Sequence, residues 1–324
     1  MRLLIVGAGS IGSRHLRNAK LLGVGDLAVF DQDAGRASAM AEETGATAFP
    51  SLEAALSWRP GAAVICTPPA HHIHAARACA TAGCHLLIEK PLAAATDGIP
   101  ELAALAARSG LGISVAYQLR FHPAIVRMRE LVCAGLIGRV LSIRAEYGQY
   151  LPAWRPARDY RETYTAQLAQ GGGILLDASH EIDYVRWIAG EARSVFATLG
   201  RLSALEMDAE DTAALVLRLD GPALAEIHLD CVRRGYARGC AIVGSEGTIQ
   251  WDSQIGLRIT AADGSVREEP IVPDPNAAYV AELDAFLKRP DAVPPMASLA
   301  DGRRVLDIVL AARESSASRR EINL

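Results

Sequence analysis

The chain has 324 residues, half of them hydrophobic, which predicts a globular protein long enough for two domains with substantial cores. Its net charge of −4 argues against a basic nucleic-acid-binding surface, and no apolar run approaches the roughly 20 residues that span a bilayer. The six cysteines form no C-x-x-C pair and lie among apolar neighbours, which is typical of reduced core residues. We therefore expect a cytoplasmic protein with no nucleic-acid or membrane partner.

The first twelve residues predict a buried strand, a glycine turn and the start of a helix. An apolar run over residues 1–6 is followed by Gly7, Gly9 and Gly12 in the pattern G-x-G-x-x-G. The first glycine permits a tight turn, the second lets the backbone approach a pyrophosphate, and the third lets the helix pack closely on the strand. The free N–H groups of that helix then face an anion. We expect the cofactor to bind at Gly7, Gly9, Ser10, Ile11 and Gly12.

An acidic residue follows the second predicted strand. Residues 27–30 are apolar and end at Asp31, which lies 24 residues after Gly7. This spacing is close to the distance, about 20 residues, at which a carboxylate meets the adenosine ribose of a dinucleotide. Because a carboxylate repels a 2′-phosphate, Asp31 favours NAD, while the nearby Arg36 keeps NADP open.

Strand and helix signals alternate through the first third of the chain. The pattern predicts further helices at 34–43, 52–58, 71–82 and 99–109, and further strands at 47–49, 62–66, 85–88 and 112–116. Strands separated by helices indicate right-handed crossovers and a parallel sheet. Ligands bind beyond the carboxyl ends of such strands, which here carry the glycine turn, Asp31, Thr67 to Pro69, Lys90 and residues 117–120.

The rest of the chain has a different pattern, in which consecutive strands follow one another without intervening helices. The pattern predicts helices at 123–134, 176–189, 277–288 and 299–315, and strands at 140–146, 194–199, 212–219, 224–230, 239–243, 248–251 and 257–260. Such a series indicates an antiparallel or mixed sheet. Because the helices are too few to cover both faces, we expect a homodimer or homotetramer built through this sheet.

Together these features resemble those of the Gfo/Idh/MocA oxidoreductases over nearly the whole length of the chain. The motifs that carry the resemblance, in order, are Gly7–Gly12, Thr67-Pro68, Glu89-Lys90-Pro91, Arg120-Phe121-His122-Pro123 and Gly171-Gly172-Gly173 followed by His180-Glu181-Ile182-Asp183. The resemblance implies an α/β fold, with an NAD(P)-binding Rossmann domain over residues 1–119. A substrate-binding and oligomerisation domain with a large, mostly antiparallel sheet would follow over residues 120–324.

The family usually oxidises or reduces a carbinol carbon of a sugar or cyclitol with NAD or NADP. The resemblance implies that Lys90 and His180 flank the substrate, and that Asp183 belongs to the same helical motif as His180. Residue chemistry agrees, because hydride transfer needs a base for the hydroxyl proton and a cation beside the developing alkoxide. Imidazole suits the first role and lysine the second. The alternatives are a solvated surface lysine and a core histidine.

The position of Asp177, three residues before His180, departs from the family pattern. Many members have an aspartate four residues before the histidine, whereas Asp177 precedes His180 by three and Leu176 occupies the expected position. Positions three apart share a face of a helix, so we predict that Asp177 orients the catalytic imidazole. A structural role for Asp177 is the alternative.

Further cofactor and substrate contacts are expected at strand ends and in one loop. Beside Lys90, the predicted cofactor contacts are Thr67, Pro68, His72 and Glu89. The predicted substrate contacts are Arg120, Trp154, Arg155, Tyr164 and Asp183. Aromatic faces stack on sugar rings and arginine binds carboxylate or phosphate, so the loop of residues 147–170 favours an anionic sugar-like substrate. A dimer contact or a solvated loop is the alternative.

Two other classes of function remain open, and a metal site is not expected. The histidines at 71, 72 and 74 lack Cys or acidic partners nearby, so we predict no metal. A tetrapyrrole reductase or dihydrodiol dehydrogenase of the same fold would prefer an apolar pocket without the arginines at 155, 158 and 161. A sensor that binds a dinucleotide without turnover has no need of both Lys90 and His180.

Overall fold

The computed structural model describes residues 1–271, 274–288 and 294–324. These residues form two compact units. The first comprises residues 1–121 and 276–303, and the second comprises residues 122–275 and 304–324. None of the helices in the described ranges has the length and apolar character that crossing a membrane requires.

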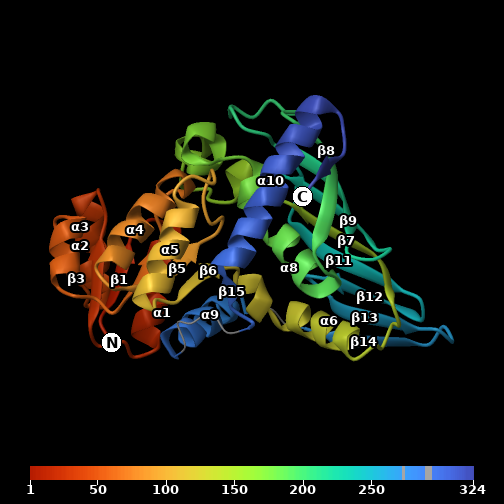
Figure 1. Cartoon of the computed structure of the whole chain (residues 1–324), viewed down its shortest axis with the longest axis horizontal. Helices are drawn as coiled ribbons and strands as arrows, with labels where there is room; N and C mark the ends of the chain where they lie inside the picture. Colours follow the sequence, from red (N-terminus) through yellow and green to blue (C-terminus); the bar gives the residue numbers. More distant parts are fainter. Residues whose placement is uncertain (272–273, 289–293) are drawn as a thin grey trace. The chain divides into compact units, whose positions relative to one another are not determined.

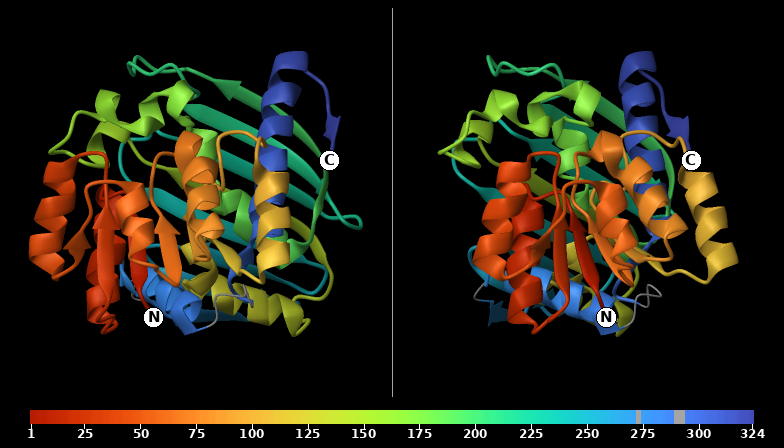
Figure 2. Two further views of the ribbon diagram at one scale, coloured as in Figure 1. Left: turned by 60° about the vertical axis from the view of Figure 1, so that its left-hand side comes forward. Right: turned by 90° about the vertical axis from the view of Figure 1, so that its left-hand side faces the viewer.

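The first unit is built on a seven-stranded sheet in the order β15-β6-β5-β4-β1-β2-β3, flanked by helices (Figure 1, Figure 2). All pairs are parallel except β15 with β6. The strands are β1 (Leu3–Val6), β2 (Leu27–Phe30), β3 (Thr47–Ala48), β4 (Ala62–Ile65), β5 (His85–Glu89), β6 (Ile113–Ala116) and β15 (Ala297–Ser298). The helices are α1 (Ser10–Leu21), α2 (Ala34–Thr44), α3 (Leu52–Ser57), α4 (His72–Thr81), α5 (Ile99–Ser109) and α9 (Ala277–Lys288), with short 3-10 turns η1 (Pro69–His71) and η2 (Gln118–Phe121).

Continuous apolar runs explain why the central strands lie inside the sheet. Every residue of β1 and of β4 is buried, because helices cover both faces of a parallel sheet. Helix boundaries follow capping chemistry: the carboxylate of Asp33 accepts from the N–H of Arg36 at the start of α2, and Gly45 ends that helix in the left-handed region. The predicted Rossmann-type parallel sheet is confirmed.

The first unit also includes residues 276–303, which the domain boundary predicted from the sequence places in the C-terminal domain. Helix α9 buries Leu283 and Phe286 in the same apolar cluster as Leu3 and Leu16, and β15 adds an antiparallel edge strand to β6. The first unit therefore extends to residue 121 and regains residues 276–303. A boundary drawn at residue 119 from the sequence does not show this return, because only tertiary packing produces it.

The second unit is built on a nine-stranded sheet in the order β14-β13-β12-β11-β7-β10-β9-β8-β16. Its pairs are antiparallel except β7 with β10, which confirms the predicted mostly antiparallel sheet. The strands are β7 (Val140–Gly148), β8 (Ala192–Gly200), β9 (Thr212–Leu219), β10 (Leu224–Asp230), β11 (Ala237–Gly244), β12 (Gly247–Asp252), β13 (Gly256–Ala261), β14 (Val266–Pro270) and β16 (Ile322–Asn323). The helices are α6 (Pro123–Cys133), α7 (Ile174–Asp177), α8 (His180–Ala189) and α10 (Leu299–Ser318), whose first residues belong to the other unit.

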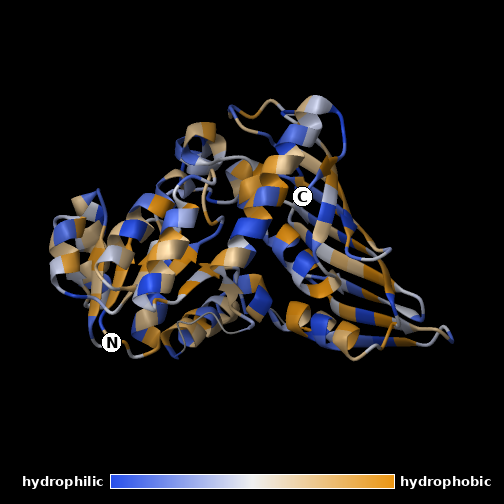
Figure 3. Ribbon diagram, in the orientation of Figure 1, coloured by the Kyte–Doolittle hydropathy of each residue, from blue (hydrophilic) through white to orange (hydrophobic). Residues whose placement is uncertain are grey.

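Buried and exposed residues alternate along β9 and β10. Helices α6 and α8 lie on one face of this sheet, the packed face, and no described helix of the unit covers the other face (Figure 1), while hydrophobic and hydrophilic residues are interspersed along its strands (Figure 3). Trp251 lies on the packed face, where its ring contacts His122 and Tyr184. We call the other face the outer face. It carries Arg144, Phe196, Val216, Leu224, Val243, Gln250 and Arg258, which are all exposed.

Three differences separate the observed elements from the predicted ones. The helix predicted over 176–189 is two helices, α7 and α8, separated by a turn at Ala178 and Ser179. Strand β14 was not predicted, because its sequence Val-Arg-Glu-Glu-Pro is mostly exposed and shows no apolar alternation. The loop predicted over 148–169 contains short 3-10 turns, η3 (Leu151–Ala153), η4 (Tyr160–Glu162), η5 (Tyr164–Ala166) and η6 (Leu168–Gln170).

Candidate functional site: a dinucleotide edge and a histidine-bearing helix

The glycine turn has the geometry that a bound pyrophosphate requires. Gly7 has φ of 100°, and a Cβ on Gly12 would lie 1.8 Å from the carbonyl oxygen of Gly7. Both positions therefore demand glycine for the packing of the chain itself. Gly9 is different, because a Cβ there would meet nothing within 4 Å. The open space above Gly9, at the uncapped N-terminus of α1, fits the close approach of a dinucleotide.

Ser10 and Ile11 form the first turn of that helix, as the motif predicts. No side chain caps the N-terminus of α1, so its N–H groups point to the edge of the sheet where the parallel strands end. The predicted contacts of Ser10 and Ile11 with cofactor would be made at this edge.

Asp31 is held rigidly at the end of β2. Its carboxylate accepts from the N–H of Ala8 at 2.6 Å and from the N–H of Asp33 at 2.8 Å. Arg36 pairs with the same carboxylate at 3.1 Å, and also with Asp33 at 3.3 Å. Each carboxylate oxygen has two lone pairs, so Asp31 retains capacity for a ribose hydroxyl. Arg36 neutralises part of the negative charge that would reject a 2′-phosphate.

The loop after β4 offers one unsatisfied polar atom. The hydroxyl oxygen of Thr67 is buried and has no hydrogen-bond partner in the part of the chain that the structure describes. Pro68 follows in an extended conformation and leads into η1. An orphaned buried hydroxyl at the carboxyl edge of a parallel sheet fits a ligand contact.

His72 lies on the same edge, but its ring is already engaged. Nδ1 lies 2.9 Å from the carbonyl oxygen of Pro91 and Nε2 lies 2.7 Å from that of Thr67. The side chain is buried, and burial lowers the pKa of its imidazole while the surrounding carbonyls oppose that shift. This geometry favours a role in joining two loops over the predicted contact with cofactor.

Glu89 and Lys90 stand at the end of the neighbouring strand β5. Glu89 is buried and accepts from the N–H of Lys90 at 3.2 Å. Its other oxygen lies 2.8 Å from Nε2 of His15, a fully buried residue of α1. Lys90 itself is partly exposed, as a residue that meets substrate must be. Sequence reasoning missed His15, because a histidine in an amphipathic helix carries no local signal of its partner.

In the second unit, His180 is the first residue of α8 and is 5% exposed. Asp183 lies one turn further along the helix and is buried. The residue after the histidine, Glu181, is fully buried and forms a two-pronged ion pair with Arg238 of β11 at 2.6 and 3.1 Å. Burial opposes the charge on Arg238, but Glu181 raises its pKa above the ordinary arginine value. This pair fixes the first turn of α8 to the sheet.

Aromatic rings surround the same pair. The guanidinium of Arg238 lies 4.8 Å from the ring of Tyr147, whose edge meets Trp154. Burial raises the pKa of the Tyr147 phenol well above its usual value, so this phenol stays protonated near neutral pH. Tyr147 is therefore not a base for the hydroxyl proton.

Asp177 does not share a helix with His180. It ends α7, and its carboxylate accepts from the hydroxyl of Tyr164 at 2.9 Å and from that of Thr165 at 2.5 Å. The prediction that Asp177 orients His180 assumed one continuous helix, and the turn at 178–179 removes that argument. The bonds from Tyr164 and Thr165 tie Asp177 to the preceding loop, and the orientation of His180 by Asp177 stays a prediction.

Arg120 is buried at 3% exposure, with its guanidinium 3.3 Å from the carboxylate of Asp301 at the start of α10. Burial raises the pKa of Asp301, but Arg120 and the Ser298 hydrogen bonds outweigh it and lower the value. The ion pair favours a structural role for Arg120 over the predicted contact with substrate.

The arginines of the loop differ in their partners. Arg161 is neutralised by Asp159 at 2.6 Å and by Glu206 at 3.2 Å. Arg155 is exposed, and no carboxylate pairs with it among the described residues. Trp154 donates from Nε1 to the carbonyl oxygen of Gln149 at 2.8 Å, which fixes the segment beside Arg155. Arg158 is also exposed and donates to the backbone oxygen of Glu162 at 3.4 Å, so Arg155 and Arg158 both have charge available for an anion, whereas Arg161 does not.

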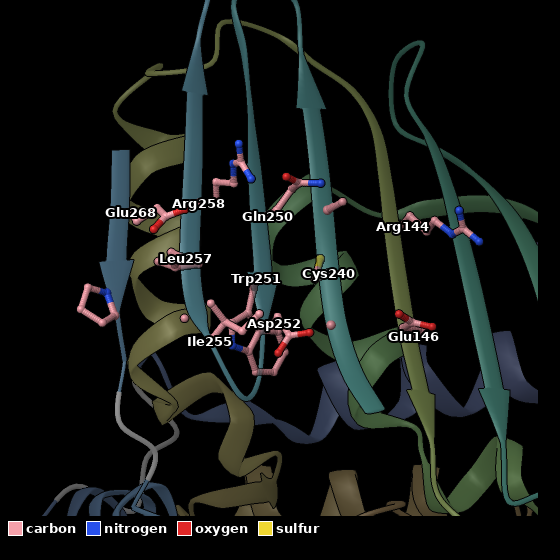
Figure 4. A pocket seen from close by; sticks show the side chains of 14 residues that line it. Arg144, Glu146, Cys240, Gln250, Trp251, Asp252, Ile255, Leu257, Arg258 and Glu268 are labelled. Carbon is pink, nitrogen blue, oxygen red and sulfur yellow. The ribbon is translucent and has the colours of Figure 1, made fainter. Parts of the chain in front are cut away.

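A hollow on the outer face lies over strands β7, β11, β12 and β13 (Figure 4), and the small residues Gly239 and Ala241 are among those that line it. Arg144 and Glu146 of β7 border it on one side, and Gln250 and Arg258 border it on the other. Because the packed face of these strands points the opposite way, this hollow belongs to the exposed surface of the sheet.

Comparisons with known proteins agree with this architecture. Residues 1–117 match the oxidoreductase family with an NAD-binding Rossmann fold, and residues 125–250 match the GFO/IDH/MocA C-terminal domain. The chain is 29% identical over 329 residues to myo-inositol dehydrogenase Hyg17 of Streptomyces leeuwenhoekii, with 98% of each chain covered. It is 28% identical over 341 residues to myo-inositol 2-dehydrogenase of Thermotoga maritima, covering 100% of this chain and 98% of the relative.

A solved structure shares the whole fold. The WlbA dehydrogenase from Bordetella pertussis, in complex with NADH and UDP-GlcNAcA, superposes with a TM-score of 0.84 at 23% identity, covering 100% of this chain and 98% of that chain. A parallel sheet with a dinucleotide turn, together with a mostly antiparallel second sheet, defines an oxidoreductase that binds NAD(P). The chain belongs to the Gfo/Idh/MocA family of NAD(P)-dependent dehydrogenases.

Proposed function

We propose that the chain transfers a hydride between NAD and a carbinol carbon of an anionic sugar derivative, either a sugar acid or a nucleotide sugar. Dehydrogenases of inositol are relatives along its whole length, which supports a polyhydroxylated substrate. The anionic character rests on one observation: Arg155 presents a charge that no carboxylate among the described residues neutralises. The coplanar donors of a guanidinium match a carboxylate or a phosphate.

We propose that Lys90 and His180 act on the reacting hydroxyl. Bound nicotinamide supplies the hydride acceptor. In oxidation, the imidazole of His180 takes the hydroxyl proton, and the ammonium of Lys90 donates a hydrogen bond to the oxygen as negative charge develops there. The match of the chain to both domain models of the family, over residues 1–117 and 125–250, supports this assignment. Asp183, Trp154 and Tyr164 are proposed to line the substrate side.

The substrate class is tested with matched neutral and anionic sugars. Absorbance at the NADH band is followed with glucose, glucuronate, myo-inositol and a UDP-sugar, each with NAD and with NADP. We expect kcat/KM to be higher for the carboxylated or nucleotide-linked compounds. Arg155→Met should then lower kcat/KM about 10- to 100-fold for the anionic compounds, since a hydrogen bond to a charged group contributes about 1.5–3 kcal/mol.

The same substitution should leave neutral sugars unaffected. Arg161→Met is the matched control, because Asp159 and Glu206 already neutralise that arginine. A preference for neutral sugars, or equal losses at positions 155 and 161, would refute the anionic substrate.

We also propose that two copies associate through the outer face, giving a homodimer or a homotetramer. Phe196 and Val216 face each other across β8 and β9 and are 45% and 44% exposed. Apolar side chains side by side on an open sheet are typical of an interface. Pairs such as Arg144 with Glu226, and the hollow over Gly239, add complementary charge and shape.

We propose the cytoplasm as its compartment. All six cysteines are free, and five of them are buried, which suits a reducing environment. Fractionation of cells that produce the protein would test this, and recovery in an oxidising compartment would contradict it.

A further inference from the structure

Hydrogen bonds hold the chain on both sides of Lys90. The Lys90 N–H donates to the Glu89 carboxylate, and the carbonyl oxygen of the next residue, Pro91, lies 2.9 Å from Nδ1 of His72. Glu89 and Pro91 are buried, and each is bound by a buried histidine from a different helix, His15 of α1 and His72 of α4. A flexible side chain such as lysine needs a fixed backbone if its amine is to meet a small target.

The first support comes from α4. His72 opens this helix and is 1% exposed. Its ring joins the carbonyl oxygens of Thr67 and Pro91, which follow the paired strands β4 and β5. Carbonyl oxygens only accept, so an N–H of the imidazole must donate in each bond that forms. The bond through Nδ1 is the one that reaches the segment after Lys90.

The second support comes from α1. Nε2 of His15 lies 2.8 Å from Oε1 of Glu89, while Nδ1 of the same ring is buried without a partner among the described residues. The Glu89 carboxylate accepts, so Nε2 of His15 carries the proton of this bond. Glu89 uses its second oxygen for the Lys90 N–H. The chain His15–Glu89–Lys90 thus connects the helix of the glycine turn with the backbone of the lysine.

We propose that His15 and His72 are positioning residues that fix the backbone on either side of Lys90, His15 through Glu89 and His72 through the Pro91 carbonyl. The inference rests on the proposed function, in which Lys90 acts on the reacting hydroxyl. It assigns both histidines a role distinct from binding cofactor or metal, since the ring nitrogens that face the Lys90 segment are occupied by protein atoms.

The two histidines use different ring nitrogens toward this segment, and this allows a reciprocal test. The amide of asparagine places a donor near the position of Nδ1, and that of glutamine places one near Nε2. His72→Asn keeps the bond to Pro91 and His72→Gln loses it. At position 15 the order reverses, because His15→Gln keeps the bond to Glu89 and His15→Asn loses it.

Turnover is the first readout. We expect His72→Gln and His15→Asn to lower kcat about 10- to 100-fold, the effect of displacing a catalytic group by about 1 Å. His72→Asn and His15→Gln should retain much more of the wild-type kcat, with KM for NAD little changed. His74, which is exposed on the same helix as His72, provides the control, and His74→Gln should behave as wild type.

The second readout does not depend on activity. The chain has three lysines, Lys20, Lys90 and Lys288, so methylation with ¹³C-formaldehyde gives three lysine signals in an NMR spectrum of the full chain. Lys90→Arg identifies the signal of Lys90. That signal should shift or broaden in His72→Gln and His15→Asn and keep its wild-type position in the two rescuing variants, while Lys20 and Lys288 stay unchanged.

The outcomes separate this inference from the proposed function. If Lys90→Ala keeps its turnover, the proposed function is wrong at Lys90, whatever the histidine variants do. If Lys90→Ala is inactive but Asn and Gln behave alike at both positions, in turnover and in the Lys90 signal, the positioning role is overturned. If the Asn and Gln variants at one position both melt at a temperature well below that of wild type, and by the same amount, that histidine has a merely structural role.

Discussion

Asp31 shows how one residue serves both the fold and the cofactor. Its carboxylate receives two backbone N–H groups, from Ala8 and Asp33, and so shapes the ends of two neighbouring strands. Arg36 adds a positive charge 3.1 Å away. We propose that the balance between the negative charge of Asp31 and the positive charge of Arg36, and not the acid alone, sets the preference between NAD and NADP.

The balance gives a prediction on cofactor choice. NAD should bind more tightly than NADP in the wild type. Asp31→Asn should weaken NAD binding about 10- to 100-fold and reduce the ratio of the two dissociation constants, since one hydrogen bond to a charged group contributes about 1.5–3 kcal/mol. Arg36→Met should instead increase the ratio of the NADP and NAD dissociation constants, because the Asp31 carboxylate then keeps its full negative charge. Dissociation constants from titration of both nucleotides decide this, and tighter NADP binding by the wild type would contradict the role of Asp31.

Asp177 gives a second prediction at the same scale. Because Tyr164 and Thr165 donate to its carboxylate, Asp177→Asn should disturb the loop around residue 164. We expect KM for the sugar to rise more than kcat falls, and Tyr164→Phe with Thr165→Val should reproduce this split. Should Asp177→Asn instead lower kcat as far as His180→Ala does, with KM unchanged, then Asp177 orients the histidine after all.

Single residues with a strong local pattern were predictable, and residues defined by their partners were not. The glycines at 7, 9 and 12 and the acid at 31 follow from spacing alone. The burial of Arg120 against Asp301 joins positions 181 residues apart, so no local pattern could indicate it. The pair of Glu181 with Arg238 joins positions 57 residues apart, so the sequence could not predict it for the same reason.

At the scale of elements, the ion pair between Arg120 and Asp301 links η2 to the start of α10. The pKa of Asp301 is lower in the folded protein than its ordinary value, so the folded state binds a proton there less tightly than the unfolded state. The stability that the pair contributes is therefore present above the ordinary aspartate pKa, about 4, and is lost as the pH falls below it.

This linkage predicts a pH-dependent effect of one substitution. Arg120→Met should lower the stability of the first unit by about 1–3 kcal/mol at pH 7, since it removes the cation beside a partly buried carboxylate, which then keeps only its other contacts, such as the hydrogen bonds from Ser298. Below about pH 4 the difference from wild type should shrink, because protonated Asp301 no longer needs a cation. Thermal melts across this range measure it. Arg17→Met, which removes an exposed pair with Glu43, is the control and should change little; a deficit that persists at low pH would exclude the linkage.

Strands and helices with regular apolar patterns were predicted well, and breaks in them were not. All the strands of the parallel sheet except the two-residue β15 follow from apolar runs and turn signals. The interruption between α7 and α8 follows directly after Asp177, whose carboxylate accepts from residues 164 and 165 outside the helix, and no apolar pattern in the helix indicates it. Strand β14 depends on its neighbour β13 for pairing, because its own side chains are mostly charged.

At the scale of the whole molecule, the open sheet predicts an assembly. Val216→Glu places a charge in the centre of the exposed apolar pair with Phe196, so it should convert the assembly to monomers at micromolar concentration. Light scattering after size exclusion measures the mass. Leu21→Glu is the control, because Leu21 is an exposed apolar residue of the other unit and is 70% exposed. A monomeric wild type, or an assembly that survives Val216→Glu, would refute association through the outer face.

The class of fold followed from the sequence, whereas the division of the chain did not. Alternating strand and helix signals indicate a parallel sheet, and consecutive strands indicate an antiparallel one. Residues 276–303 belong to the first unit because Leu283 and Phe286 pack into a core with residues near the start of the chain, such as Leu3 and Leu16. Local patterns carry no information on such long-range packing.

The central claim is that the glycine turn and Asp31 hold the cofactor, while Lys90 and His180 act on the substrate hydroxyl. The most direct test compares wild type, Lys90→Ala and His180→Ala, measuring NADH formation with the best substrate and, on the same samples, the dissociation constant for NAD. The account predicts a fall in turnover of about 10²- to 10⁴-fold for each variant, with the affinity for NAD nearly unchanged. If His180→Ala retained most of its turnover, the proton would be taken by another group, with Tyr164 or Lys90 as the candidates, and the central claim would be contradicted.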